Sequence, residues 1–220
     1  MNVCIDAGNT MTKIGYLQSG ELIKTDSIPT KPPENLYKVF SGKEFDRIIW
    51  SDVSNAPSHV INYLKNKAKD FISLSRETSI PIKILYKKDE NLGSDRIALA
   101  TGAWALYPDT DNLIVSAGTC ITYDFVTRDG SYQGGAISPG IQMRFKALHE
   151  FSAKLPLVNI NEEPPIINGR STSECSGCRL KGSVTSSRSD GRAIKSIEGA
   201  GSAACSGFAV SSQPARHFDR

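Results

Sequence analysis

Three short polar stretches of this sequence combine residue types that could bind a nucleotide and transfer a phosphoryl group. Asp6-Ala-Gly-Asn-Thr10 ends one apolar run, Ser116-Ala-Gly-Thr119 interrupts another, and Gly93-Ser-Asp-Arg96 precedes a run rich in alanine and leucine. The N–H groups of a glycine turn can cradle phosphates, and a carboxylate can hold magnesium through water. Together the stretches predict an ATP site beside an acid that acts on a hydroxyl group.

The first stretch supplies several of the groups that a triphosphate needs. Asp6, at a strand end, can reach the water shell of a metal, and Gly8 lets the backbone approach an anion. The further side chains that could contact phosphate oxygens are Asn9, Thr10, Thr12 and Lys13. A plain hairpin turn explains the same residues without a ligand. The matching turn at 116–119 favours the phosphate-binding interpretation.

The stretch Gly93-Ser-Asp-Arg96 places an acid in the first turn of a predicted helix. An acid there often only complements the helix dipole. Asp95 follows Gly93 and Ser94 and precedes Arg96. It could therefore accept a proton from a substrate hydroxyl while Arg96 donates two parallel hydrogen bonds to a substrate carboxylate. The dipole favours an ionised Asp95, which predicts a base that acts through its position and not through a raised pKa.

The elements around these stretches predict an α/β fold. Strands are expected at 2–7, 12–18, 47–53 and 81–86, and helices at 59–71 and 94–107. This alternation predicts an α/β domain over residues 1–110. Residues 112–126 repeat the order of strand, glycine turn and strand, which indicates a duplicated domain whose two turns face each other across a cleft.

The remaining sequence divides into an ordered part and an unusual tail. A glycine- and proline-rich loop is expected from residue 134, followed by an amphipathic helix that ends at Pro156. Residues 173–220 are rich in Ser, Gly, Ala and Arg without a regular period, which predicts loop or disorder. Residues 111–172 hold too few elements for a complete second copy. We interpret 173–220 as an aberrant terminus, such as a frameshifted one.

Composition limits the partners. The chain has 220 residues, 39% of them apolar, and a net charge of +3 with both signs interspersed. That distribution argues against nucleic acid and membrane surfaces and favours small molecules. The sequence has neither a spanning apolar stretch nor a secretory signal, so a cytoplasmic location is expected. Cys175 and Cys178 have the gap of a zinc knuckle but lack a second pair, which favours a chance spacing.

In order and spacing, four motifs resemble type III pantothenate kinase, a bacterial enzyme of coenzyme A synthesis. They are IDAGNT, GSDR, AGTCITYDFV and GGAISPGIQMRFKALHEFSAKLP, and the resemblance covers about residues 1–172. It implies the fold of the acetate and sugar kinase/Hsp70/actin superfamily, in which two ribonuclease-H-like domains enclose a nucleotide cleft. Residues 1–110 would form the first domain and 111–172 an incomplete second one, and 173–220 do not match.

The resemblance also implies site residues. The ATP-binding set would be Asp6, Ala7, Gly8, Asn9, Thr10, Met11, Thr12, Lys13 and Thr119. The pantothenate-binding set would be Tyr86, Gly93, Ser94, Asp95, Arg96 and Thr172, with Asp95 as the proton acceptor. Asp6 would hold magnesium through water, and Ser116 takes the family's position for a monovalent cation.

The implied reaction moves the γ-phosphate of ATP to the terminal hydroxyl of pantothenate. The product is 4'-phosphopantothenate, the first intermediate of coenzyme A biosynthesis. The implied cofactors are magnesium and potassium or ammonium, and the implied assembly is a homodimer. An aspartate is usual in the family at position 116, whereas this chain has Ser116, a neutral and weaker cation ligand. The unmatched tail would leave the second sheet with an unpaired edge.

Two other functions remain open from the sequence. Ser116 and the tail favour a catalytically impaired relative that binds nucleotide as a regulatory or accessory protein. The intact Asp6, Asp95 and Arg96 oppose that interpretation. A third possibility keeps the ATPase fold but uses a sugar or acetate as acceptor, and the spacing of GSDR argues against it.

Overall fold

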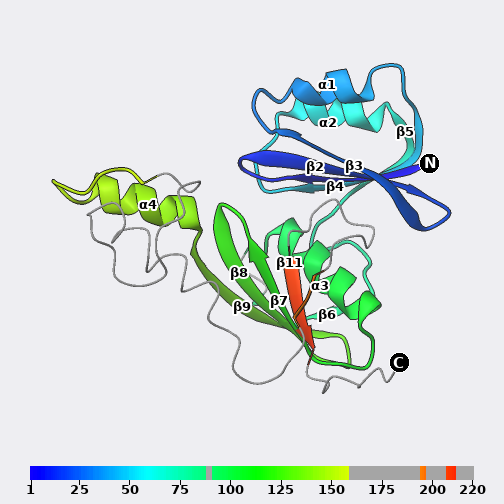
Figure 1. The fold of residues 1–220 in the computed structure, drawn as a ribbon. Coiled ribbons are helices and arrows are strands. Elements are labelled where there is room, and N and C mark those ends of the chain that lie inside the picture. The colour runs from blue at the N-terminus through cyan, green and yellow to red at the C-terminus, as the bar shows by residue number, and fades with distance from the viewer. Residues whose placement is uncertain (88–90, 159–193, 197–206, 212–220) are drawn as a thin grey trace, which may run out of the picture.

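The chain folds into a mixed α/β structure with two β-sheets, each accompanied by helices (Figure 1). This computed structural model describes residues 1–87, 91–158, 194–196 and 207–211. Within these ranges, none of the helices has the length and apolar character needed to cross a membrane.

The first sheet has the strand order β3-β2-β1-β4-β5. Its strands are β1 (Asn2–Ala7), β2 (Met11–Gln18), β3 (Glu21–Pro29), β4 (Phe45–Asp52) and β5 (Ala68–Ser73). Strands β1, β2 and β3 form an antiparallel meander, whereas β4 is parallel to β1 and β5 is parallel to β4. Helices α1 (Asn35–Phe40) and α2 (Ser58–Lys65) pack on this sheet through a core that includes Phe40, Trp50 and Leu64.

Two expectations for the first part of the chain need correction, and two elements were not expected. The helix predicted over 59–71 ends at Lys65, and β5 follows it. The apolar spacing of 68–71 also suits an edge strand, and pairing with β4 selects that form. The strand predicted at 81–86 is reduced to β6 (Lys83–Ile84), which pairs with the second sheet. Strand β3 and helix α1 were not predicted.

The second sheet has the strand order β10-β11-β7-β8-β9-β6. Strands β7 (Asn112–Ala117), β8 (Cys120–Val126) and β9 (Ser131–Pro139) form an antiparallel meander that repeats the pattern of β1, β2 and β3. Helix α3 (Ser94–Leu106) packs its apolar side against this sheet. The second core includes Leu99, Ala100 and Ala103 from the helix and Ile114, Val126 and Tyr132 from the strands.

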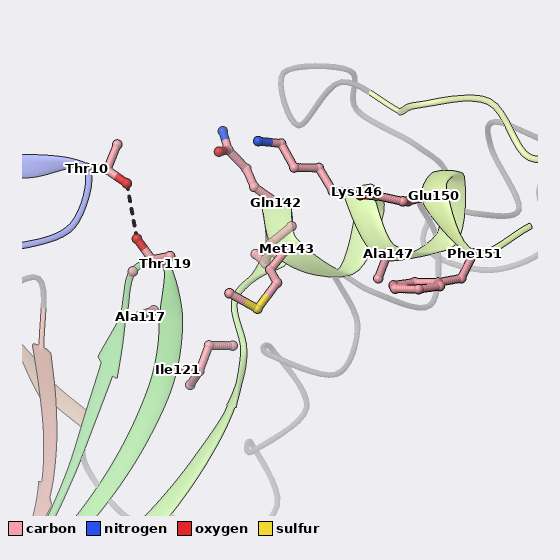
Figure 2. Close-up of a pocket in the computed structure, with 12 residues that line it drawn as sticks. Thr10, Ala117, Thr119, Ile121, Gln142, Met143, Lys146, Ala147, Glu150 and Phe151 are labelled. Atoms are coloured by element: carbon pink, nitrogen blue, oxygen red, sulfur yellow. Dashed lines mark hydrogen bonds between the residues drawn. The ribbon is translucent and has the colours of Figure 1, made fainter. Parts of the chain in front are cut away.

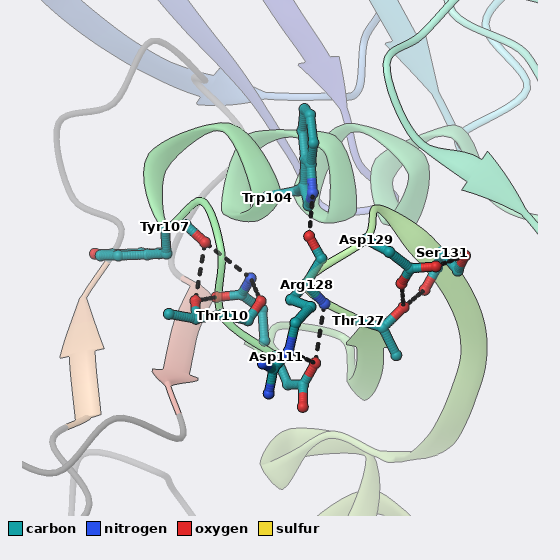
Figure 3. Close-up of polar contacts among 9 residues, drawn as sticks. Trp104, Tyr107, Thr110, Asp111, Thr127, Arg128, Asp129 and Ser131 are labelled. Carbon is teal, nitrogen blue, oxygen red and sulfur yellow. Dashed lines mark hydrogen bonds and ion pairs between the residues drawn. The ribbon is translucent and has the colours of Figure 1, made fainter.

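A polar network at the end of the second sheet holds the far end of α3 (Figure 3). Trp104 Nε1 donates to the backbone oxygen of Arg128 at 3.3 Å, and Arg128 N donates to Asp111 Oδ1 at 2.9 Å. Buried Asn112 donates through Nδ2 to Thr110 O at 3.0 Å. These bonds fix the C-terminal end of α3 against the strand connections.

Two expectations for the second part also need correction. The loop predicted from residue 134 is part of β9, and α4 (Ile141–Glu150) follows and extends away from the sheet (Figure 1). Glycine suits this strand because a Cβ at Gly135 would run into the backbone oxygen of Tyr123. Inside 173–220, where loop or disorder was predicted, the chain forms β10 (Ile194–Ser196) and β11 (Gly207–Ser211).

Strand β11 changes the expected edge of the second sheet. It pairs antiparallel with β7 from Gly207 opposite Ser116 to Ser211 opposite Asn112. The edge of β7 is therefore occupied, contrary to the prediction of an unpaired strand. Thr172 and the Cys175–Cys178 pair lie outside the described residues.

Candidate active site

The two glycine turns meet at the mouth of a cleft between the sheets. In the first turn Gly8 N donates to Met11 O at 3.2 Å, and in the second Gly118 N donates to Cys120 O at 2.9 Å. The hydroxyl oxygens of Thr10 and Thr119 lie 3.2 Å apart, which Figure 2 shows as a direct contact between the turns. The pattern repeated in the sequence thus produces two turns that face each other.

Two cavities adjoin this contact. One, of about 480 Å³, lies between the sheets and contains the carboxylates of the site. The other, of about 640 Å³, continues between the second turn and α4, where Gln142, Met143 and Lys146 line it (Figure 2). Thr10 and Thr119 line both cavities, and the contact between their hydroxyl groups lies where the two cavities adjoin.

Asp6 lies at the end of β1 on the wall formed by the first sheet. It is the cross-strand partner of Lys13, so the two side chains lie on the same face. Asp6 Oδ1 is buried and has no hydrogen-bond partner. Burial, followed by the nearby charge of Asp95, raises the pKa of Asp6 to about 7. An unpaired buried oxygen with a raised pKa is suited to binding a cation or its water.

Asp95 faces this wall from the first turn of α3. Its Oδ1 accepts a hydrogen bond from Arg96 N at 2.8 Å. Gly93 permits this arrangement, because a Cβ there would run into Asp95 Oδ1. Burial raises the pKa of Asp95 above its ordinary value despite this hydrogen bond and the nearby Arg96. The prediction of a base without a raised pKa was therefore wrong, since burial outweighs the favourable position at the helix start.

A buried serine pair fixes the start of α3 relative to the first sheet. Ser94 Oγ lies 3.0 Å from Ser51 Oγ and accepts a hydrogen bond from Asp52 N at 3.0 Å. Ser51 is also the β4 partner of Asp6 in the sheet register. The carboxylates of Asp6 and Asp95 are therefore held by elements that are themselves bonded to each other.

Arg96 is buried behind the cleft wall, with 5% of its surface exposed. Its Nε donates to Asp124 Oδ1 at 2.8 Å, and Tyr132 donates its hydroxyl to the same oxygen at 2.6 Å. Asp124 and Tyr132 were not predicted as site residues from the sequence. An acid inside the apolar run ITYDFV was the available signal, because a buried carboxylate needs a partner.

The cleft brings together most of the residues predicted for the site. Those that line it are Asp6, Gly8, Asn9, Thr10, Met11, Lys13, Tyr86, Gly93, Asp95, Arg96, Ser116 and Thr119. Ala7 and Thr12 are paired on the opposite face of the strands and line a separate cavity near α1 and α2. Ser94 is turned toward Ser51.

The described residues can be tested for their fit to the implied metals. The unpartnered Oδ1 of Asp6 beside a glycine turn fits a magnesium ion held through water. Ser116 offers only a neutral hydroxyl, and its partner across the sheet is Thr122, also neutral. This pair does not fit a monovalent cation held by a carboxylate. Within the described ranges, no group of three or more His, Cys, Asp or Glu side chains gathers at a metal-binding distance.

The sequence of this chain is similar to those of known proteins. The family model described as type III pantothenate kinase matches residues 2–180. A protein from Phocaeicola vulgatus named type III pantothenate kinase is 40% identical over 172 residues, which are 78% of this chain and 71% of the relative. The chain belongs to the type III pantothenate kinase family.

Further relatives extend this result. A type III pantothenate kinase from Christiangramia forsetii is 42% identical over 171 residues, which are 76% of this chain and 69% of the relative. A crystal structure from Campylobacter jejuni, of a protein placed in the Baf family of transcriptional activators, aligns with a TM-score of 0.50 and 23% identity. It covers 83% of this chain and 75% of that protein, and supports the fold alone.

Proposed function

We propose that this member of the type III pantothenate kinase family phosphorylates pantothenate with ATP. The product is 4'-phosphopantothenate, and the reaction is the first step of coenzyme A biosynthesis. One observation carries the proposal, namely the cleft that joins both glycine turns to the facing carboxylates of Asp6 and Asp95. The family model and the relatives named for this activity support the choice of acceptor.

The glycine turns and Lys13 bind and orient the phosphates of ATP in this proposal. Backbone N–H groups and short hydroxyl side chains at Thr10 and Thr119 donate toward phosphate oxygens. Asp6 holds magnesium through water, and the ion, when bound, neutralises charge on the transferring phosphoryl group. Because the two turns already touch, bound phosphates must part Thr10 from Thr119.

Asp95 acts on the acceptor. Its carboxylate orients the terminal hydroxyl of pantothenate toward the γ-phosphorus. It accepts the hydroxyl proton as the new oxygen–phosphorus bond forms and the bond from the γ-phosphorus to the leaving ADP oxygen breaks. Burial favours this role, because a base with a raised pKa accepts a proton more readily. Tyr86, Gly93 and Arg96 border the same side of the cleft and would contact the acceptor. Thr172 completes the set proposed from the family resemblance.

The proposed architecture is that of two actin-like ATPase domains. Residues 1–110 would form the first, 111–172 an incomplete second, and 173–220 an aberrant tail. The packing of α3 and β6 with the second sheet favours a first boundary nearer residue 75, and the pairing of β11 with β7 favours including β11 in the second domain. A homodimer, a cytoplasmic location and a monovalent cation also remain proposals from the family resemblance.

The proposal is tested by measuring ADP release from ATP and magnesium with and without pantothenate. Pantothenate-dependent release is expected, and Asp95→Asn should reduce it by about 10²–10⁴ while nucleotide binding persists. Asp109→Asn is the matched control, because it makes the same chemical change in an exposed loop. Normal turnover by Asp95→Asn would overturn the assigned role of this residue.

The same assay separates the rival functions. ATP binding without pantothenate-dependent turnover would indicate the regulatory or accessory relative. Turnover with a sugar or acetate in place of pantothenate would indicate a different acceptor.

A further inference from the structure

A buried ion pair lies directly behind the acceptor side of the cleft. Asp124 is fully buried on β8, and its Oδ1 lies 2.8 Å from Arg96 Nε and 2.7 Å from Arg96 Nη2. Tyr132 on β9 donates its hydroxyl to this oxygen at 2.6 Å. A single carboxylate oxygen therefore holds one edge of the Arg96 guanidinium.

Arg96 also borders the proposed site. Arg96 lines the cleft, and its Cζ lies 5.8 Å from the centroid of the Tyr86 ring. The Tyr86 and Tyr132 rings are themselves 6.4 Å apart. Asp124, Tyr132 and Tyr86 thus surround the guanidinium, and we call these three residues the Arg96 clamp.

The energetics of the pair point to a role beyond stability. Removing two charges from water costs more than their attraction commonly returns, and apolar residues of similar size often stabilise a core equally well. The surrounding core is apolar, with Leu99, Ile114 and Val126 as neighbours in the same cluster. An ion pair kept in such a core is best explained by the direction that it gives to Arg96.

We propose that Asp124 is a positioning residue, which with Tyr132 orients Arg96 toward the acceptor bound in the cleft. This inference deepens the proposed function and rests on it for the identity of that acceptor. Asp124 contacts both Nε and Nη2 of Arg96, so these two nitrogens are not available for a bidentate interaction with a substrate carboxylate. Arg96 then contacts pantothenate through its remaining Nη hydrogens, and Asp124 neutralises its charge.

Asp124→Asn and Tyr132→Phe test the clamp with little change of shape. Asp124 Oδ2 is buried without a hydrogen-bond partner, so an amide nitrogen can take its place while the other oxygen still accepts from Arg96. Both variants should raise KM for pantothenate about tenfold or more and leave KM for ATP within about twofold of the parent value. Asn112→Ala is the control, because it disturbs a buried polar residue of the neighbouring strand away from Arg96.

A double variant tests whether Asp124 acts through Arg96. If it does, adding Asp124→Asn to Arg96→Lys should raise KM for pantothenate no further than Arg96→Lys alone. Independent, multiplicative effects in the double variant would overturn the proposal. So would variants that lower the melting temperature as Asn112→Ala does and leave KM for pantothenate unchanged.

A readout independent of activity separates the clamp from the proposed function. In nuclear magnetic resonance spectra, the Nε–H signal of Arg96, identified by its loss in Arg96→Lys, should exchange slowly with water. Asp124→Asn should speed this exchange. Rapid exchange in the parent protein would overturn the clamp whatever the activity. A slowly exchanging signal in a protein without pantothenate turnover would refute the proposed function and leave the Arg96 geometry standing.

Discussion

Asp6 shows how one carboxylate links stability to the proposed chemistry. Its pKa rises from an ordinary value of 3.8 to about 7 because the folded chain buries it near Asp95. Between these values the folded state keeps a proton that the unfolded state has lost. The folded state therefore binds more protons, and stability must fall as pH rises through this interval. Above about pH 7 the full destabilisation is present.

Asp6→Asn should remove much of this pH dependence. We expect the free energy of unfolding of the unliganded parent protein to decrease from about pH 4 to about pH 7, and that of Asp6→Asn to decrease less. Asp95, whose pKa is also raised, accounts for the slope that remains. Urea titrations across this interval measure the effect, with Asp109→Asn as control. Equal slopes in the parent and Asp6→Asn would contradict the buried-carboxylate argument.

Ser116 predicts a weak response to potassium. A hydroxyl has no net charge to offset the cost of dehydrating a cation, so potassium should stimulate the parent protein little compared with sodium. Ser116→Asp restores a carboxylate at this position and should raise both the activity and the potassium response. Steady-state rates in the two salts at equal ionic strength make the comparison, with Ser116→Ala as control. Strong potassium activation of the parent protein would refute the prediction.

At the scale of an element, the start of α3 determines where Asp95 points. A Cβ at Gly93 would run into Asp95 Oδ1, whereas Gly102, farther along the same helix, has open space around it. Gly93→Ala should therefore displace the carboxylate and lower kcat by up to about 10²-fold, because small misplacements of a reacting group are costly. Gly102→Ala should leave kcat unchanged and stabilise the protein by about 0.5–1 kcal/mol.

Kinetics and thermal unfolding of both variants distinguish placement from stability. A fall of kcat in Gly93→Ala without a comparable fall of the melting temperature supports the steric argument. An unchanged kcat in Gly93→Ala would show that Asp95 does not depend on this glycine.

The elements show what the sequence can and cannot predict. Both glycine turns and their flanking strands were predicted, because apolar runs and turn residues are local signals. Strand β5 and the glycine-rich part of β9 were missed, because pairing with β4 and β8 selects their conformation. In both segments the local sequence pattern is compatible with more than one conformation, and pairing with a neighbouring strand selects the extended one.

The residues of the candidate site likewise include some that the sequence predicts and some that it does not. The stretches that carry Asp6 and Asp95 were found from residue types and spacing, and the structure places both side chains on one cleft. The bond between Arg96 and Asp124 joins residues 28 positions apart, and no local pattern indicates that pairing. The raised pKa of Asp95 likewise depends on burial, which its sequence neighbours do not reveal.

At the scale of the whole molecule, the cleft joins two separate cores. One contains Trp50 and Leu64 and lies between the first sheet and helices α1 and α2, and the other contains Leu99 and Tyr132 and lies between α3 and the second sheet. The hydrogen bonds between the two parts include the Thr10–Thr119 and Ser51–Ser94 pairs. A nucleotide bound to both turns would add contacts that neither part makes alone. Nucleotide binding should therefore couple the unfolding of the two cores.

Calorimetry of the unliganded protein and of Asn112→Ala tests this coupling. Asn112 is buried beside the second core, so Asn112→Ala should lower the unfolding temperature of that core and leave the first core unchanged. A nonhydrolysable ATP analogue with magnesium, at a hundred times its Kd, should stabilise the parent protein by about 2.7 kcal/mol and make the cores unfold together. If the analogue stabilises only one core, the triphosphate does not bridge the two glycine turns.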